Sequence, residues 1–143
     1  MISIAIDGPS GAGKSSLAKR LAAELGYVYV DTGAMYRAIG LCALRAGADT
    51  KDAAAVTALL PGIRLDIRAG SGAQQVLLNG EDVSAAVRAE AVGMAASDVS
   101  AHPAVRDYLL ATQRGLAESR NVLMDGRDIG TVVLPQATVK IYL

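Results

Sequence analysis

A phosphate-binding chemistry is indicated by residues 8–15, which read GPSGAGKS. Gly8, Gly13, Lys14 and Ser15 match the Walker A pattern, and the segment follows an apolar run and opens a helical one. In such a loop, consecutive backbone N–H groups surround a β-phosphate, the lysine reaches the β and γ oxygens, and the serine hydroxyl binds Mg²⁺. The pattern predicts a Mg²⁺-bound nucleoside triphosphate as ligand and leaves the phosphate acceptor open.

A second acidic position completes this type of site in the segment VLMDG at residues 122–126. A Walker B carboxylate lies at the end of a buried strand next to the first strand, so we expect Asp125 to hold Mg²⁺ through water. Asp7, directly before the loop, has two interpretations. It is either a hydrogen-bond acceptor that stabilises the loop, which we favour, or a group that faces the metal.

Three arginines follow the elements that should surround the crevice of the sheet. Arg37 lies one helical turn after the DTG segment, Arg106 lies in a long helical pattern, and Arg127 follows Asp125. Guanidinium groups bind phosphate monoesters through two parallel hydrogen bonds, and several of them at one point would neutralise charge during phosphate transfer. An exposed ion pair is the alternative for any one of them.

Two classes of nucleotide-binding protein fit poorly. A signalling GTPase needs Asp-x-x-Gly after its third strand, but Asp128 occupies that glycine position, and neither Asn79 nor Asn121 begins an Asn-Lys-x-Asp motif. A motor ATPase is normally longer. The 14 acidic and 14 basic residues balance, so no net field attracts nucleic acid or a membrane. We expect neither partner.

The chain of 143 residues has the length of a single domain, and its apolar patterns predict a parallel α/β sheet flanked by helices. The predicted strands are residues 2–6, 27–30, 121–126 and 138–143. Helices are predicted at residues 14–25, after DTG, at residues 89–100 and at residues 104–119. The apolar set of the helix after DTG is Met35, Ile39, Ala43 and Leu44. In the last helix Val105, Leu109, Thr112 and Leu116 share one face. Residues 63–68 and 74–80 predict an inserted antiparallel hairpin.

Two further features concern the surroundings of the protein. Cys42 is the single cysteine, which suits a reducing compartment, and we expect it to be buried on a helix. The N-terminus MISIAID has no basic leader, and no apolar run reaches membrane-spanning length. We therefore expect a cytoplasmic protein.

Four segments together resemble the bacterial cytidylate kinase family, whose members transfer the γ-phosphate of ATP to CMP or dCMP. They are IAIDGPSGAGKSS, DTGAMYRA, LNGEDVS and MDGRDIGTVVLP, within a resemblance that runs from residue 2 to 143. It implies a P-loop nucleoside monophosphate kinase fold in one domain, residues 1–143, with the insert at about 63–80 in the CMP-binding region. The adenylate, shikimate and gluconate kinases share the loop but lack these blocks.

The resemblance also implies roles for individual residues. The expected ATP-binding residues are Gly8, Pro9, Ser10, Gly11, Ala12, Gly13, Lys14, Ser15 and Ser16, and the expected metal-side residues are Ser15 and Asp125. The expected acceptor contacts are Thr32, Arg37, Ser97, Arg106, Arg127 and Asp128, with Lys14, Arg127 and Asp128 catalytic. Ser97 and Arg106 would read cytosine. The alternatives are a helix-interface role for Ser97, a helix cap for Thr32, and a turn cap or a pair with Arg127 for Asp128.

Family members continue beyond the segment that corresponds to VKIYL, with a lid, a last strand and an adenine-binding loop. We therefore expect the 143 residues alone to be a truncated domain of low activity, and a monomer by family likeness. Two alternatives stay open: another P-loop kinase for a small acceptor, and a non-catalytic nucleotide-binding fragment. The sequence does not separate CMP from dCMP as the preferred acceptor.

Overall fold

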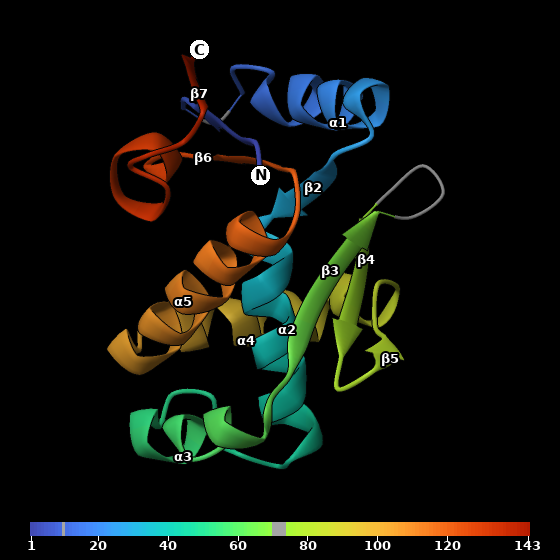
Figure 1. Cartoon of the computed structure of the whole chain (residues 1–143). Coiled ribbons are helices and arrows are strands. Elements are labelled where there is room, and N and C mark those ends of the chain that lie inside the picture. Colours follow the sequence, from blue (N-terminus) through green and yellow to red (C-terminus); the bar gives the residue numbers. More distant parts are fainter. Residues whose placement is uncertain (10, 70–73) are drawn as a thin grey trace. The chain divides into compact units, whose positions relative to one another are not determined.

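The computed structural model describes residues 1–9, 11–69 and 74–143 (Figure 1). The strands of its main sheet are parallel. Its strands follow the order β2-β6-β1-β7. They are β1 (Ser3–Asp7), β2 (Val28–Asp31), β6 (Val122–Gly126) and β7 (Val139–Tyr142). β1 pairs in parallel with both β6 and β7, and β6 pairs in parallel with β2. The predicted parallel α/β sheet is confirmed, with Asp125 on the strand beside β1.

Five α-helices accompany the strands in the described part of the chain. They are α1 (Lys14–Leu25), α2 (Thr32–Arg45), α3 (Ala53–Thr57), α4 (Glu90–Ser100) and α5 (Pro103–Ser119). Three short helical turns are η1 (Leu60–Gly62), η2 (Ala86–Arg88) and a π-helical turn, η3 (Ile129–Val133). The bounds of α1, α4 and α5 were predicted within one residue. The helix after DTG was predicted without bounds, and α2 begins inside that segment, at Thr32. The helix α3 and the short turns were not predicted.

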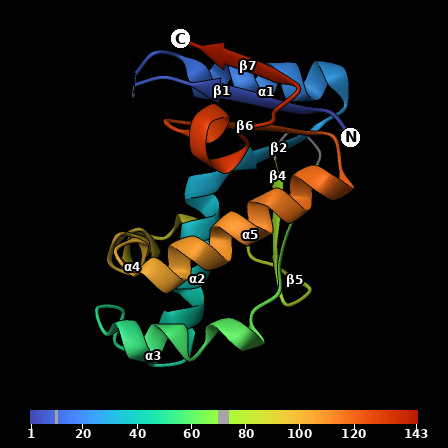
Figure 2. The same ribbon diagram turned by 60° about the vertical axis from the view of Figure 1, so that its left-hand side comes forward.

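The chain divides into two compact units, each described here by itself. The first unit comprises Met1–Thr32, Ile67–Gln74 and Gln113–Leu143, and the second comprises Gly33–Asp66 and Gln75–Thr112. In the first unit α1 packs on one face of the sheet, and Figure 2 shows it running beside β1. The core there is formed by Ile4, Ile6, Ala18, Ala22, Tyr29 and Leu123. The small Ala18 and Ala22 lie one turn apart and let the helix approach the strands closely.

Asp7, the last residue of β1, ties the sheet to η3. Its Oδ1 accepts from the backbone N–H of Ile129 at 2.7 Å, and its Oδ2 accepts from that of Gly130 at 2.8 Å. The carboxylate is 9% exposed, so these two bonds replace almost all of its contact with water. Asp7 is therefore a structural hydrogen-bond acceptor, as we favoured, but the segment that its carboxylate holds is η3 rather than the phosphate loop.

We expect Asp7→Ala to lower the free energy of unfolding by about 2 kcal/mol, because two buried N–H groups lose their acceptor. Urea unfolding measures this change. Asp52→Ala is the matched control: Asp52 also accepts two backbone N–H groups, from Ala54 and Ala55, but at the exposed start of α3. Its loss should cost about 1 kcal/mol, the usual value for a helix cap. Equal costs for the two substitutions would contradict the role assigned to burial.

In the second unit α2 and α4 approach each other at Gly40. A Cβ atom there would lie 2.9 Å from the backbone nitrogen of Ala96, so no other residue fits without a shift of one helix. The prediction for the buried face of α2 was wrong at Leu44, which is 42% exposed, and Cys42 is only half-buried. The buried stripe consists of Ala34, Met35, Ala38, Ile39, Gly40, Leu41 and Ala43. It is wide because α2 is covered on more than one side.

The small sheet has three strands, β3 (Leu65–Ala69), β4 (Gln74–Leu78) and β5 (Glu81–Asp82), in the order β3-β4-β5. A strand to residue 80 was predicted, but β4 ends at Leu78, and Asn79 and Gly80 have φ values of 51° and 85°. Two positive φ values in an Asn-Gly pair are typical of a type I′ hairpin turn, which reverses the chain into β5. The predicted connection at residues 70–73 lies outside the described residues.

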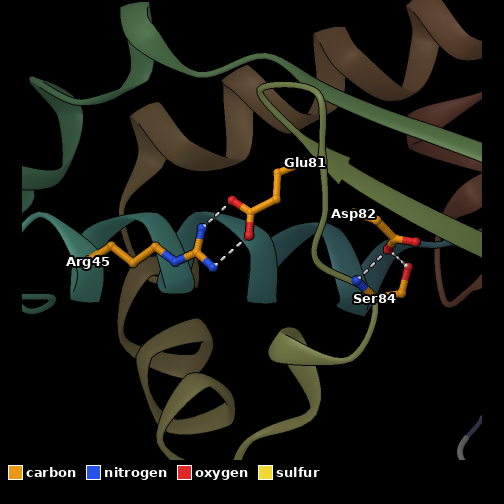
Figure 3. A network of polar contacts seen from close by, with 4 residues as sticks. All are labelled: Arg45, Glu81, Asp82 and Ser84. Carbon is orange, nitrogen blue, oxygen red and sulfur yellow. Dashed lines mark hydrogen bonds and ion pairs between the residues drawn. The ribbon is translucent and has the colours of Figure 1, made fainter.

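An exposed ion pair joins this sheet to α2 within the second unit (Figure 3). The two terminal nitrogens of Arg45 donate to the two carboxylate oxygens of Glu81 at 2.8 and 3.1 Å. These bonds lower the pKa of Glu81 from its ordinary 4.5. Stability from the pair is therefore present above pH 4.5 and is lost as the pH falls through the lowered pKa of the folded state.

We expect Arg45→Gln to raise the pKa of Glu81 toward its ordinary value, because the hydrogen bonds to the charged carboxylate are lost. A carbon-13 NMR titration of the carboxyl groups measures this shift. Asp82 is an internal control, since its pKa is lowered chiefly by the hydroxyl of Ser84 and not by Arg45. An unchanged Glu81 titration would show that the pair in Figure 3 does not persist in solution.

Candidate functional site

The predicted phosphate loop connects β1 to α1 within the first unit. Gly11 and Gly13 have φ values of 82° and 84°, a left-handed conformation that favours glycine. Gly13 is the N-cap of α1 and places no side chain over the first turn, so the backbone N–H groups there remain open to an anion. Gly8 is close to other backbone: a Cβ atom on it would lie 2.9 Å from the carbonyl oxygen of Leu143. Ser10 lies outside the described residues.

Three polar side chains open α1. Lys14 is half-buried, and it forms no ion pair within the described part of the chain. Ser15 and Ser16 are exposed on the same first turn, and Pro9, within the loop, is exposed as well. The ammonium group of Lys14 therefore has no competing carboxylate among the described residues. This arrangement suits a lysine that binds phosphate oxygens.

The hydroxyl of Tyr29 connects the two residues predicted on the metal side. It donates to Oδ1 of Asp125 at 2.9 Å and lies 3.5 Å from Oγ of Ser15. Strand pairing explains the first contact. Tyr29 lies opposite Leu123, and Asp125 is two residues further along β6 on the same face, about 6.6 Å away, within reach of a tyrosine side chain. Burial raises the pKa of Tyr29 well above its ordinary value, so the hydroxyl keeps its proton and acts as donor.

The donor set around Tyr29 fits Mg²⁺ rather than a metal held by protein alone. Mg²⁺ typically binds one or two protein oxygens together with waters and phosphate oxygens. Ser15 offers a hydroxyl and Asp125 a buried carboxylate, 8% exposed, on either side of one hydroxyl group. Within residues 1–9, 11–69 and 74–143, no group of three or more His, Cys, Asp or Glu side chains is arranged to hold a metal ion.

The remaining candidates of the first unit follow the carboxyl ends of β2 and β6. Thr32 is the first residue of α2, directly after Asp31, which pairs with Asp125. Arg127 and Asp128 are exposed between β6 and η3. The backbone carbonyl of Asp128 accepts from Val132 and Val133, but its side chain makes no capping bond. Ligands of parallel sheets bind at this edge, so all three residues have suitable positions.

The acceptor candidates of the second unit are Arg37, Ser97 and Arg106. Nη1 of Arg37 donates to the carbonyl oxygen of Val87 at 2.8 Å. A Cβ atom on Gly93 would lie 3.1 Å from Nη2, so the guanidinium group lies against α4 where that helix has no side chain. Ser97 is exposed one helical turn after Gly93, on the same face. The Arg37 guanidinium group therefore lies against the turn of α4 that precedes Ser97.

Arg106 is exposed in the first turn of α5. No sequence pattern identifies Val87 or Gly93 as partners of Arg37. Val87 binds the guanidinium group through its backbone carbonyl, and Gly93 leaves room for it because it has no side chain. Tyr29 was also missed as a site residue. Its signal was its place in YVYV, where alternation puts Tyr29 and Asp31 on one face of the strand that leads into DTG.

Comparisons with known proteins identify the family of the chain. The family model described as "Cytidylate kinase" matches residues 4–143. The cytidylate kinase of Geobacillus kaustophilus is 54% identical over 142 residues, covering 99% of this chain and 63% of the relative. That of Nocardia farcinica is 52% identical over 141 residues, covering 98% and 61%.

The chain therefore spans about 63% of the length of such relatives. Among the described residues, no helix is long and apolar enough to cross a membrane. The family model covers almost every residue that the site contains, from β1 to β7. The chain belongs to the cytidylate kinase family.

Proposed function

We propose that this protein transfers the γ-phosphate of ATP to CMP or dCMP with the help of Mg²⁺, giving ADP and the cytidine diphosphate. The observation that carries the proposal is the grouping of Ser15 and Asp125 about one hydroxyl beside the uncapped start of α1, in a chain of the cytidylate kinase family. Such a grouping suits a metal-bound triphosphate. Location in the cytoplasm and a monomeric state remain predictions.

The donor nucleotide would occupy the phosphate loop, Gly8 to Ser16. The backbone N–H groups at the start of α1 would bind the β-phosphate, and Lys14 would reach the β and γ oxygens. The Ser15 hydroxyl would bind Mg²⁺ directly, and Asp125 would do so through water. When bound, the ion offsets charge on the phosphate oxygens. The chain itself supplies orientation and fixed positive charge.

The acceptor would be read by two kinds of contact. Arg37 has five N–H donors, of which Val87 occupies one, so others remain for a phosphate monoester. Ser97 and Arg106 would bind the cytosine edge, which offers an amino donor and two acceptors. Uracil reverses the pattern at its N3 and O4 positions and would leave site groups unpaired. The site thus favours cytosine.

Transfer needs positioning and charge neutralisation more than proton removal. Lys14 and Arg127 would offset the charge on the moving phosphoryl group. Asp128 would orient the acceptor through its exposed carboxylate, and we do not assign it as an obligatory general base.

A coupled assay of ADP release with CMP, dCMP, UMP and AMP tests the proposal. We expect CMP and dCMP to support faster release than UMP and AMP. A clear AMP preference would contradict the acceptor assignment and favour another small-acceptor kinase. ATP binding without turnover of any of the four would favour a non-catalytic nucleotide-binding module.

A further inference from the structure

We propose that Tyr29 is a positioning residue that holds the Asp125 carboxylate in the orientation needed on the metal side of the site. The inference rests on the proposed function in one respect: it takes a Mg²⁺-bound triphosphate as the ligand of the loop. It does not depend on which acceptor is used. Tyr29 acts through Asp125 and need not touch the nucleotide or the ion.

The two contacts of the Tyr29 hydroxyl are unequal. The bond to Oδ1 of Asp125, at 2.9 Å, has ordinary hydrogen-bond length, whereas the 3.5 Å approach to Oγ of Ser15 is at the limit. The hydroxyl therefore holds the carboxylate firmly and leaves the serine hydroxyl able to turn toward an ion. Within the described part of the chain, no other side chain or backbone N–H donates to Asp125.

The ring of Tyr29 is itself fixed. It is 7% exposed and belongs to the core between α1 and the sheet, with Ile6, Ala18 and Leu123 among its neighbours in that cluster. The ammonium group of Lys19, one turn after Ser15 on α1, lies 6.0 Å from the ring centroid. A ring held in this way can restrict the carboxylate more than a mobile water would.

A fixed carboxylate matters because Mg²⁺ demands near-ideal octahedral geometry. Removal of partners that orient direct metal ligands typically changes metal affinity by about 10-fold to 100-fold, and because Asp125 would act through water we expect the lower end of this range for Tyr29. Here Oδ1 is held by Tyr29, and Asp125 keeps its second oxygen for the water shell of the ion. Loss of the hydroxyl would let the buried carboxylate rotate. ATP binding would then become weaker in the presence of Mg²⁺, whereas ATP binding without Mg²⁺ would stay unchanged.

The test uses calorimetric ATP binding by the whole chain, without CMP, over a series of Mg²⁺ concentrations and in EDTA. For Tyr29→Phe, which keeps the buried ring, we expect the half-saturating Mg²⁺ concentration to rise about 10-fold. The affinity for ATP in EDTA should stay unchanged. Tyr27→Phe is the matched control, since Tyr27 packs against the same cluster but has no contact with Asp125. It should leave both values unchanged.

A double-substitution cycle separates positioning from a general effect on the fold. In an Asp125→Ala background, Tyr29→Phe should change the Mg²⁺ dependence no further, because alanine removes the acceptor through which Tyr29 acts. Additive effects of the two substitutions would overturn the inference, as would an equal loss of ATP affinity with Mg²⁺ and in EDTA. ATP binding by the unsubstituted chain that ignores Mg²⁺ would overturn it as well.

These outcomes are independent of the acceptor assay. Mg²⁺-dependent ATP binding that weakens in Tyr29→Phe would support the positioning role even if CMP were not phosphorylated. CMP-dependent ADP release with an unchanged Mg²⁺ response in Tyr29→Phe would leave the proposed function intact and reject the role of Tyr29. The failure of one proposal is therefore distinguishable from the failure of the other.

Discussion

Lys14→Met is expected to lower the rate of CMP-dependent ADP formation by about 1,000-fold, the upper part of the range for loss of one preorganised donor to a transition state. Lys14 is the first residue of α1 and is half-buried, and its ammonium group has no carboxylate partner in the described part of the chain. Methionine keeps the length of the side chain and removes only the charge and the donors. Initial rates with saturating ATP and CMP measure the effect.

A second readout does not require turnover. Calorimetric binding of Mg²⁺-ATP to Lys14→Met should weaken by about 30-fold, because one charged contact to the phosphates is lost. Lys51→Met is the control, since Lys51 is an exposed lysine of the second unit, outside every candidate position. An unchanged ATP affinity in Lys14→Met, with Lys51→Met behaving like the unsubstituted chain, would reject the loop as the donor site.

Arg37→Met should raise the dissociation constant for CMP by about 100-fold and leave the affinity for ATP unchanged, because it removes the charged group that we propose as the partner of the CMP phosphate. One nitrogen of the guanidinium group donates to the Val87 carbonyl, which fixes the side chain, and the other N–H groups would bind the ligand. Lysine has the charge but cannot make both sets of bonds at once. Arg37→Lys should therefore give a smaller loss, about 10-fold.

Calorimetric titration of CMP measures both Arg37 variants. Arg64→Met provides the control, because Arg64 is an exposed arginine in the same unit, and its backbone rather than its side chain makes the bonds to Asn79. Equal CMP affinity in Arg37→Met and Arg64→Met would remove Arg37 from the acceptor site. An equal loss for Arg37→Lys and Arg37→Met would show that geometry, rather than charge, decides the interaction.

The sequence predicted those parts of the fold in which local pattern and long-range packing agree. Residues 14–25 are helical with the predicted bounds because Gly13 and Gly26, both at positive φ, delimit an apolar stripe of helical period. The strands at β1 and β6 are short apolar runs that are buried on both faces, which is typical of a parallel sheet. These positions need no knowledge of distant partners.

The errors arise where a local signal was outweighed or overlooked. Leu44 has the helical spacing of a core residue, yet α2 ends near it and the side chain is exposed. Asn79 and Gly80 are a hairpin signal that was included in a strand, and β5 followed unpredicted. Tyr29 could not be found from a motif. Its hydroxyl reaches Asp125 because the strand register places Tyr29 opposite Leu123, two residues before Asp125 on β6.

The position of β1 in its sheet has a consequence for the order in which the protein can fold. β1 is formed by residues 3–7, whereas its two neighbours, β6 and β7, are formed by residues 122–126 and 139–142. The carboxylate that ends β1 likewise waits for N–H groups 122 and 123 residues further on. Residues 122–142 must therefore leave the ribosome before the phosphate loop has both supporting strands, and nucleotide binding during synthesis would report the pairing of β1 with β6 and β7.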